Sequence, residues 1–446
     1  MKIIISVSLI FVAAFSVAQT KTSISGVIKS EGQNKGIEYA HVFLKNGTVG
    51  TYSNIQGQFT FNIPDSLASD TLKISRIGYH NYDLSLSKID FNDTLKIFLQ
   101  ESALNLKEVV IHDHRDSVTA IIERVLKKIR KNYPTKLHYL EGFYRQLSLK
   151  GDTYTRLIEA SIGVTENSYM KERTTSKVKI RQLRKSEDYR EYSLKLKMLN
   201  AATHKMGKTL WGMEFDNSIY SLLKINYPKV NKQEITIWSK DHNFIEIFDF
   251  EITDVTQVDS STLYYHIKFQ LPPDSSDAFA YYGGEMVINM TDYAIIEWTY
   301  GMTKHPYKTF PAQKRSLFFK DKYFYKDHVI YSKVGNKYFP TFFERLSPAG
   351  GGTTSHIDKE TGKKRLQYSK VTFMVNRVVA RKKEFDRIKR RDELDNEVNI
   401  YEMDHQYDST FWNNYNILIF DPLLKSAKDD LEKEETLKKQ FEKNGE

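Results

Sequence analysis

The sequence predicts a mainly β protein with minor helices: an N-terminal β-sandwich followed by a large curved antiparallel β-sheet, a half-barrel, with inserted helices. Three observations predict this fold class. Short alternating apolar runs, broken by Gly, Asn and Asp, fill residues 22–100, and longer alternating runs fill residues 139–378. The 446 residues also include 28 Tyr and 26 Phe, which suit half-buried pleated surfaces.

Residues 1–18 have the pattern of a signal peptide. No charged residue occurs from Ile3 to Ala18, and Ser16 and Ala18 place small residues where signal peptidase requires them. The apolar run is shorter than the roughly 20 residues of a membrane span. We therefore predict export to the periplasm or outer membrane of a Gram-negative envelope. N-terminal sequencing of the envelope fraction should begin at Gln19, and a protein that begins at Met1 would contradict this.

Composition excludes several chemistries. Cysteine is absent, which excludes disulfides, thiol nucleophiles and Cys-based zinc sites. Without residues 1–18 the chain has 65 basic and 56 acidic residues. This excess either favours anionic neighbours, such as lipid phosphates or acidic polysaccharide, or serves solubility alone.

Residues 19–101 are expected to form the sandwich. Gly47 and Gly57 lie where turns require positive φ, and Phe59 and Tyr79 are bulky enough to fill a thin core. The segment resembles the carboxypeptidase regulatory-like domain, a transthyretin-like sandwich, at Gly26-Val27-Ile28, Asn54-x-x-Gly57-x-Phe59 and Ser75-x-x-Gly78-Tyr79. The resemblance implies an adaptor or spacer without peptidase activity.

Residues 102–138 are expected to form a linker strand and a helix. Residues 106–111 have the pattern of a strand, and Asp116 and Ser117 are suited to cap a helix through Lys131. Its apolar stripe comprises Val118, Ile121, Ile122, Val125, Leu126 and Ile129. Tyr133-Pro134 should end it.

Residues 139–422 are expected to form the curved sheet. Alternation predicts strands at 142–149, 154–164, 244–258, 263–271, 283–290, 294–302, 315–325, 329–333, 337–346 and 366–378. A basic segment with few long apolar runs predicts a helical insert at about 171–224. Residues 423–446 are expected to form a charged, solvated C-terminal tail that frays as a helix.

Part of this domain resembles the half-barrels of periplasmic lipoprotein carriers. The resemblance rests on the run from Tyr282 to Asn289, on Tyr293-Ala294-Ile295-Ile296, and on the run from Gly335 to Phe342. It implies a surface that binds an apolar or amphipathic ligand or a partner protein.

No local catalytic motif is present. The sequence has no His-Glu-x-x-His and no Gly-x-Ser-x-Gly, and Met206-Gly207-Lys208-Thr209 lacks the upstream glycine of a phosphate-binding loop. His112 and His114 would point the same way on a strand, so with Asp113 they could hold zinc, or they could belong to a polar interdomain linker. No cofactor is predicted.

Two further groups of charged residues allow more than one interpretation. Paired carboxylates could hydrolyse glycans without a local motif, or could simply face solvent from a half-exposed sheet; the candidates are Glu251, Asp254, Glu285 and Glu297. A basic cluster could dock on anionic lipid or lipopolysaccharide phosphates, or could form a solvated helix. It comprises Arg377, Arg381, Lys382, Lys383, Arg387, Lys389, Arg390 and Arg391. Nucleic acid is disfavoured by the predicted compartment.

The functional hypothesis is a non-enzymatic envelope protein with an adaptor sandwich and a β domain that binds an apolar or amphipathic ligand or a partner protein. The alternative is an accessory enzyme or binding protein acting on polysaccharide. The two differ in what the concave face of the sheet should carry: aromatic side chains for the first, and convergent carboxylates for the second.

Overall fold

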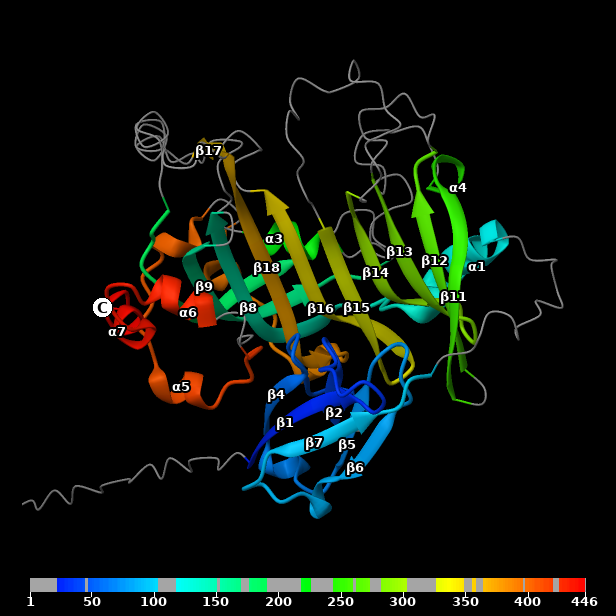
Figure 1. Cartoon of the computed structure of the whole chain (residues 1–446), viewed down its shortest axis with the longest axis horizontal. Helices are drawn as coiled ribbons and strands as arrows, with labels where there is room; N and C mark the ends of the chain where they lie inside the picture. The colour runs from blue at the N-terminus through cyan, green and yellow to red at the C-terminus, as the bar shows by residue number, and fades with distance from the viewer. Residues whose placement is uncertain are drawn as a thin grey trace, which may run out of the picture.

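The computed structural model in Figure 1 shows two β-rich parts packed together. It describes residues 22–44, 47–102, 118–150, 153–169, 176–190, 218–225, 244–259, 262–272, 282–302, 326–348, 355–357, 364–395, 398–419 and 425–445. The mainly β fold class predicted from the sequence is confirmed. The boundaries at residues 101, 138 and 422 stay a prediction. The predicted signal peptide, residues 1–18, lies outside the described residues.

Two small sheets form the N-terminal sandwich. The first has the order β4-β1-β7 and the second the order β3-β2-β5-β6. Their strands are β1 (Thr22–Ser30), β2 (His41–Leu44), β3 (Gly50–Tyr52), β4 (Gln58–Ile63), β5 (Thr71–Ser75), β6 (Tyr82–Ser85) and β7 (Leu95–Leu99), with short 3-10 helices η1 (Asp65–Leu67) and η2 (Leu86–Lys88).

The sandwich core confirms most of the expected buried aromatic residues and turn glycines. Phe59 is fully buried, whereas Tyr79 is only half-buried against the same core. Gly47 and Gly57 both have positive φ, at +64° and +79°. A Cβ at Gly57 would lie 2.0 Å from the Ile28 carbonyl oxygen, so only glycine fits this turn.

The second part is one open antiparallel sheet. Its order is β10-β9-β8-β18-β16-β15-β14-β13-β12-β11, with β17 paired to β18, and β10 and β11 are its edges. The strands are β8 (His138–Lys150), β9 (Thr153–Glu166), β10 (Lys177–Lys185), β11 (Asp249–Asp259), β12 (Thr262–Gln270), β13 (Tyr282–Asn289), β14 (Ala294–Met302), β15 (Lys326–Val334), β16 (Lys337–Pro348), β17 (Ser355–Ile357) and β18 (Lys364–Val379).

Helices cover one face of this sheet. They are α1 (Val118–Asn132), α3 (Ile219–Leu223) and α4 (Phe244–Ile247), and all three contribute to one apolar cluster with the strands. The predicted stripe of α1 is confirmed, since Ile121, Ile122 and Val125 are buried. The Tyr133 hydroxyl, just after α1, donates to the Ile295 carbonyl at 2.7 Å and fixes the end of the helix on the sheet.

The sandwich and the C-terminal region cover the opposite face. Phe342 and Phe343 are neighbours in β16 and therefore point to opposite faces. Phe343 belongs to the helix-covered cluster, whereas Phe342 packs with Tyr52 of the sandwich and Trp412 of the C-terminal region. The backbone joins the two parts as well, because the Val378 N–H donates to the Thr48 carbonyl at 2.9 Å.

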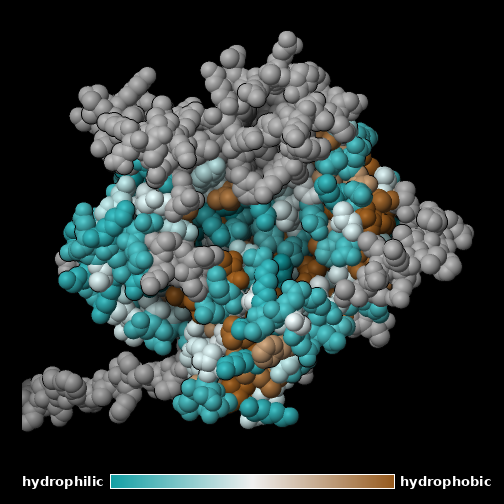
Figure 2. Space-filling view, in the orientation of Figure 1, coloured by the Kyte–Doolittle hydropathy of each residue, from teal (hydrophilic) through white to brown (hydrophobic). Residues whose placement is uncertain are grey.

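Two expectations about the second part were only partly right. The helical insert expected at about 171–224 is helical at α3, but residues 177–185 form strand β10, where Val178 and Leu183 enter the core; residues 170–175 and 191–217 lie outside the described residues. The tail is not simply solvated. Its helices α6 (Lys425–Leu431) and α7 (Leu437–Lys443) bury Leu431 and Phe441 against β8 and β9, although Figure 2 shows mainly hydrophilic side chains over this side of the molecule.

The remaining elements follow β18. They are the 3-10 helices η5 (Lys382–Glu384), η6 (Arg390–Asp392) and η7 (Ile400–Glu402) and the helix α5 (Ser409–Asn413). Among the helices of the described residues, none is both long enough and apolar enough to cross a membrane.

Candidate functional site

The two faces of the large sheet carry different chemistry. On the helix-covered face, Val329, Phe343 and Phe373 lie side by side across β15, β16 and β18, and all three are fully buried. On the sandwich-covered face, the corresponding layer contains buried carboxylates, Glu159 and Glu297 among them, in ion pairs. The helix-covered face also buries the ion pair of Asp327 with Arg345, but it carries a large apolar cluster and is the candidate for ligand binding.

A set of five packed aromatic residues, called here the aromatic surface, lies between α4 and the sheet. Phe269 of β12 is at its centre, with ring centroids 4.8 Å from Trp298 and 6.3 Å from Tyr300 of β14. Phe244 and Phe248 pack on Phe269 from the α4 side, at 5.4 and 5.3 Å. All five side chains are buried. Such edge-to-face and tilted pairs add to the stabilisation that burial provides.

Gly284 on β13 allows Phe269 to occupy this position. It pairs directly with Phe269 across the strands. A Cβ at residue 284 would lie 1.9 Å from the Thr299 carbonyl oxygen and 2.6 Å from Phe269 Cζ. The glycine pair in the predicted carrier-like strand is therefore a requirement of the aromatic surface.

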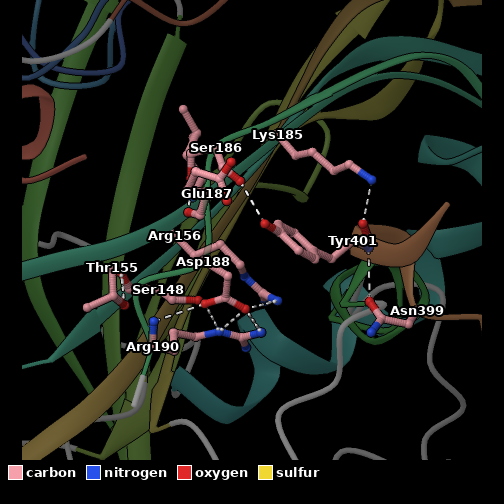
Figure 3. A network of polar contacts seen from close by, with 11 residues as sticks. Ser148, Thr155, Arg156, Lys185, Ser186, Glu187, Asp188, Arg190, Asn399 and Tyr401 are labelled. Carbon is pink, nitrogen blue, oxygen red and sulfur yellow. Dashed lines mark hydrogen bonds and ion pairs between the residues drawn. The ribbon is translucent and has the colours of Figure 1, made fainter. Parts of the chain in front are cut away.

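A polar network closes the helix-covered face at its β9–β10 end (Figure 3). The buried Arg156 guanidinium lies 3.8 Å from the Asp188 carboxylate, which also accepts hydrogen bonds from the Arg190 side chain, the shortest from Nε at 2.7 Å and from Nη2 at 2.5 Å. The Tyr401 ring lies within 5.2 Å of the Arg156 guanidinium, and its hydroxyl donates to the Ser186 carbonyl at 2.9 Å. Burial raises the pKa of the Tyr401 hydroxyl well above its ordinary value. These contacts hold the C-terminal region on the sheet. The apolar part of the same face is the aromatic surface.

An ion-pair network joins the sandwich to the other face. Arg76 Nη1 contacts Glu297 Oε2 at 2.8 Å, and His328 Nε2 contacts Glu297 Oε1 at 2.7 Å. Burial alone would raise the pKa of the Glu297 carboxyl, but the Arg76 guanidinium and the hydrogen bond with His328 lower it to about 2. Tyr39 donates to Glu344 at 3.0 Å, and Glu344 also pairs with Lys370 at 3.1 Å.

The candidate carboxylates for glycan chemistry lie on β11, β13 and β14, and the strand register places Glu251 and Glu285 on either side of Lys268 of β12. Glu251, Asp254 and Glu285 are exposed, and Glu285 contacts His266 at 3.1 Å. Glu297 is the exception to the expected outward orientation, because the sandwich covers it and Arg76 neutralises it. Arg76 lies 221 residues away in sequence, and no local pattern signals the pairing.

The other predicted site residues are distributed as follows. His112 and His114 lie outside the described residues. Within the described ranges, no cluster of three or more His, Asp or Glu side chains could hold a metal ion. The basic cluster is exposed, but it does not form the solvated helix considered as one interpretation. Strand β18 continues to Val379, and the residues of the cluster beyond it include the short 3-10 helices η5 and η6.

The comparison with known protein families agrees with the N-terminal sandwich. Residues 24–111 match the family of the CarboxypepD_reg-like domain. No characterised protein matches the sequence.

Solved structures similar to the chain include the following three. A LolA-superfamily protein from Nitrosomonas europaea is 10% identical over 59% of this chain and 97% of that chain, with a TM-score of 0.21. A DUF1329 family protein from Desulfovibrio piger is 8% identical over 58% and 91%, with a TM-score of 0.22. A domain described as an outer-membrane lipoprotein-sorting protein, from Vibrio parahaemolyticus, is 7% identical over 56% and 89%, with a TM-score of 0.20. At these identities and scores the likeness does not extend to ligand or activity.

The chain therefore combines a CarboxypepD_reg-like sandwich with a large open antiparallel sheet. One face of that sheet is covered by helices and carries the aromatic surface, and the other is covered by the sandwich and the C-terminal region and carries the Arg76–Glu297 ion pair.

Proposed function

We propose that the protein is an exported, non-enzymatic envelope protein that binds the apolar part of an amphipathic ligand on the aromatic surface. The observation that carries this proposal is the packing of Phe244 and Phe248 of the α4 region on Phe269 and Trp298 of the sheet. Ligand sites are mostly lined by apolar and aromatic side chains, with a few polar groups that fix orientation.

The helix α4 is suited to act as a displaceable cover. It has only four residues, and a single helical turn has little stability of its own. Its position therefore depends on the side-chain packing of Phe244 and Phe248. An acyl chain or ring of a ligand would take the place of these two side chains on Phe269 and Trp298. Because the ligand would bury a similar apolar area, the free energy of burial would change little.

The ion pairs of the sandwich-covered face support a binding role over a catalytic one. Its buried carboxylates are held by cations, since Glu297 pairs with Arg76 and Glu344 with Lys370. Paired carboxylates that cleave glycans must reach a sugar from both sides of the scissile bond. The sandwich covers the Glu297 and Glu344 carboxylates and, in this proposal, serves as an adaptor or spacer.

Tryptophan fluorescence tests the proposal, because the four tryptophans of the chain include one on each face. Trp298 belongs to the aromatic surface, whereas Trp412 packs on Phe143 of the opposite face. Two full-length variants should be prepared, each with a single tryptophan at one of these positions and Phe at the other three. We expect a brominated fatty acid, which quenches by contact, to quench the Trp298 variant saturably and to leave the Trp412 variant unchanged.

Equal quenching of the two variants, or none in either, would overturn the assignment of the ligand to the aromatic surface. In parallel, the protein should be screened against envelope and plant glycans. Turnover that disappears on substitution of a strand carboxylate would replace the proposal by the polysaccharide-processing alternative.

A further inference from the structure

The segment after β18 carries a dense run of exposed positive charge. Between residues 381 and 391, called here the basic segment, seven side chains are basic and exposed: Arg381, Lys382, Lys383, Arg387, Lys389, Arg390 and Arg391. Only Glu384 and Asp386 are acidic in the same stretch.

Two apolar residues hold the basic segment against the protein. The Phe385 ring stacks on the Tyr139 ring of β8 with centroids 5.5 Å apart and an angle of 18° between the planes. Ile388, three residues later, is buried. The basic side chains lie on both sides of these anchors and are exposed, so the segment presents them to solvent.

Two acidic residues just after the basic segment also form ion pairs with β10. Glu393 pairs with Lys177, and Asp392 with Lys179 at 3.6 Å, both lysines being on the edge strand β10. Within the described part of the chain, the ion pairs of the basic segment itself are Arg381 with Glu384 at 3.4 Å and Arg391 with Asp392 at 3.6 Å. Exposed pairs of this kind neutralise little charge, so the segment presents a net positive surface.

We propose that the basic segment docks the protein on the anionic phospholipid headgroups of a bilayer. Several exposed cations spread along one loop suit a surface that carries many phosphates at once. A single small anion is a poorer fit, because the hollow of about 380 Å³ beside Arg390 is also lined by Glu393 and Asp395. The docking surface goes beyond the proposed function, since it requires no ligand on the aromatic surface.

Vesicle co-sedimentation of the full-length protein tests this proposal. The probe is a phosphatidylcholine vesicle with about 30 mol% phosphatidylglycerol, compared with pure phosphatidylcholine at low ionic strength. The test variant replaces Lys382, Lys383, Lys389 and Arg390 by Gln. We expect the wild type to bind only the anionic vesicles, and the variant to bind them on the order of 10³-fold more weakly.

The matched control replaces four exposed lysines of the C-terminal region by Gln, at Lys428, Lys433, Lys438 and Lys439, so that net charge is the same in both variants. It should keep most of the wild-type affinity. Raising the salt concentration from about 50 to about 300 mM should release the wild type, because the Debye length shortens. Equal weakening in the two variants, or equal binding to neutral vesicles, would overturn the proposal. Circular dichroism of each variant verifies that the fold is intact.

Discussion

Replacing Glu159 by Gln should lower the free energy of unfolding by about 3–5 kcal/mol, because it leaves two buried guanidinium groups without a counter-charge. Glu159 is fully buried on the sandwich-covered face and contacts Arg145 at 2.6 Å and Arg184 at 2.5 Å. Burial alone would raise the pKa of its carboxyl, but the Arg184 and Arg145 guanidinium groups outweigh this and hold the pKa below its ordinary value. Denaturant titration at neutral pH measures the change.

Glu285→Gln is the matched control for this loss. Glu285 is on the same sheet and also contacts a nitrogen base, His266, but about half of its side chain is exposed. Its replacement should change the free energy of unfolding by less than about 1 kcal/mol, because exposed pairs contribute little. Replacing Glu159, Arg145 and Arg184 together by apolar residues of similar volume should lower the free energy of unfolding far less than Glu159→Gln alone. A loss of similar size for Glu285→Gln and Glu159→Gln would show that burial does not set the effect.

Much of the fold was predictable because each strand and helix shows its own periodicity. The α1 stripe and the alternation along β8, β9 and β12 to β16 are local patterns, and the structure confirms these elements. Strand β10 shows where this fails. The pairing with β9 shifts register between Ile180 and Gln182, so Val178, Ile180 and Leu183 do not follow a period of two. The bulge therefore made a strand resemble a helical insert.

The polar contacts were not predictable, since they join residues that are distant in sequence. Arg76 follows β5 of the sandwich and Glu297 is in β14 of the large sheet, and no local pattern links the two residues. Leu431 and Phe441 were expected to face solvent because their spacing gives no continuous stripe, yet Leu147 and Leu157 receive them. By contrast, the sequence predicts that Phe269 and Trp298 lie on strands. Their contact with Phe244 and Phe248 could be found only from the structure.

The interface between the sandwich and the sheet contains a buried histidine that should make the protein sensitive to acid. The His41 ring is stacked between Phe43 and Tyr52, at 4.5 and 4.6 Å, and its Nδ1 shares a hydrogen bond of 3.0 Å with Ser332 Oγ of β15. Ser332 and the Tyr52 hydroxyl both contact Thr341 Oγ1, at 2.9 and 2.6 Å. Burial lowers the pKa of the His41 ring to about 3, so the ring is neutral in the folded protein at neutral pH.

The free energy of unfolding should therefore fall as the pH falls below about 6.5, where the unfolded chain takes up a proton that folded His41 excludes. Its contribution is complete above pH 6.5 and is lost progressively down to about pH 3. The slope is about 1.36 kcal/mol per pH unit, or roughly 2–3 kcal/mol between pH 6.5 and 4.5. Carboxyls such as Glu297, with its pKa lowered to about 2, add their own loss mainly below their ordinary value of 4.5.

Urea titrations at several pH values between about 7.5 and 4.5 would measure this slope in the wild type and in two variants. His41→Gln removes the titrating ring, so its free energy of unfolding should depend less steeply on pH than that of the wild type. Ser332→Ala removes the same hydrogen bond but keeps the ring, so it should lower stability at every pH without making the slope shallower. If His41→Gln and the wild type lose stability in parallel, proton exclusion at His41 is not the cause of the acid sensitivity.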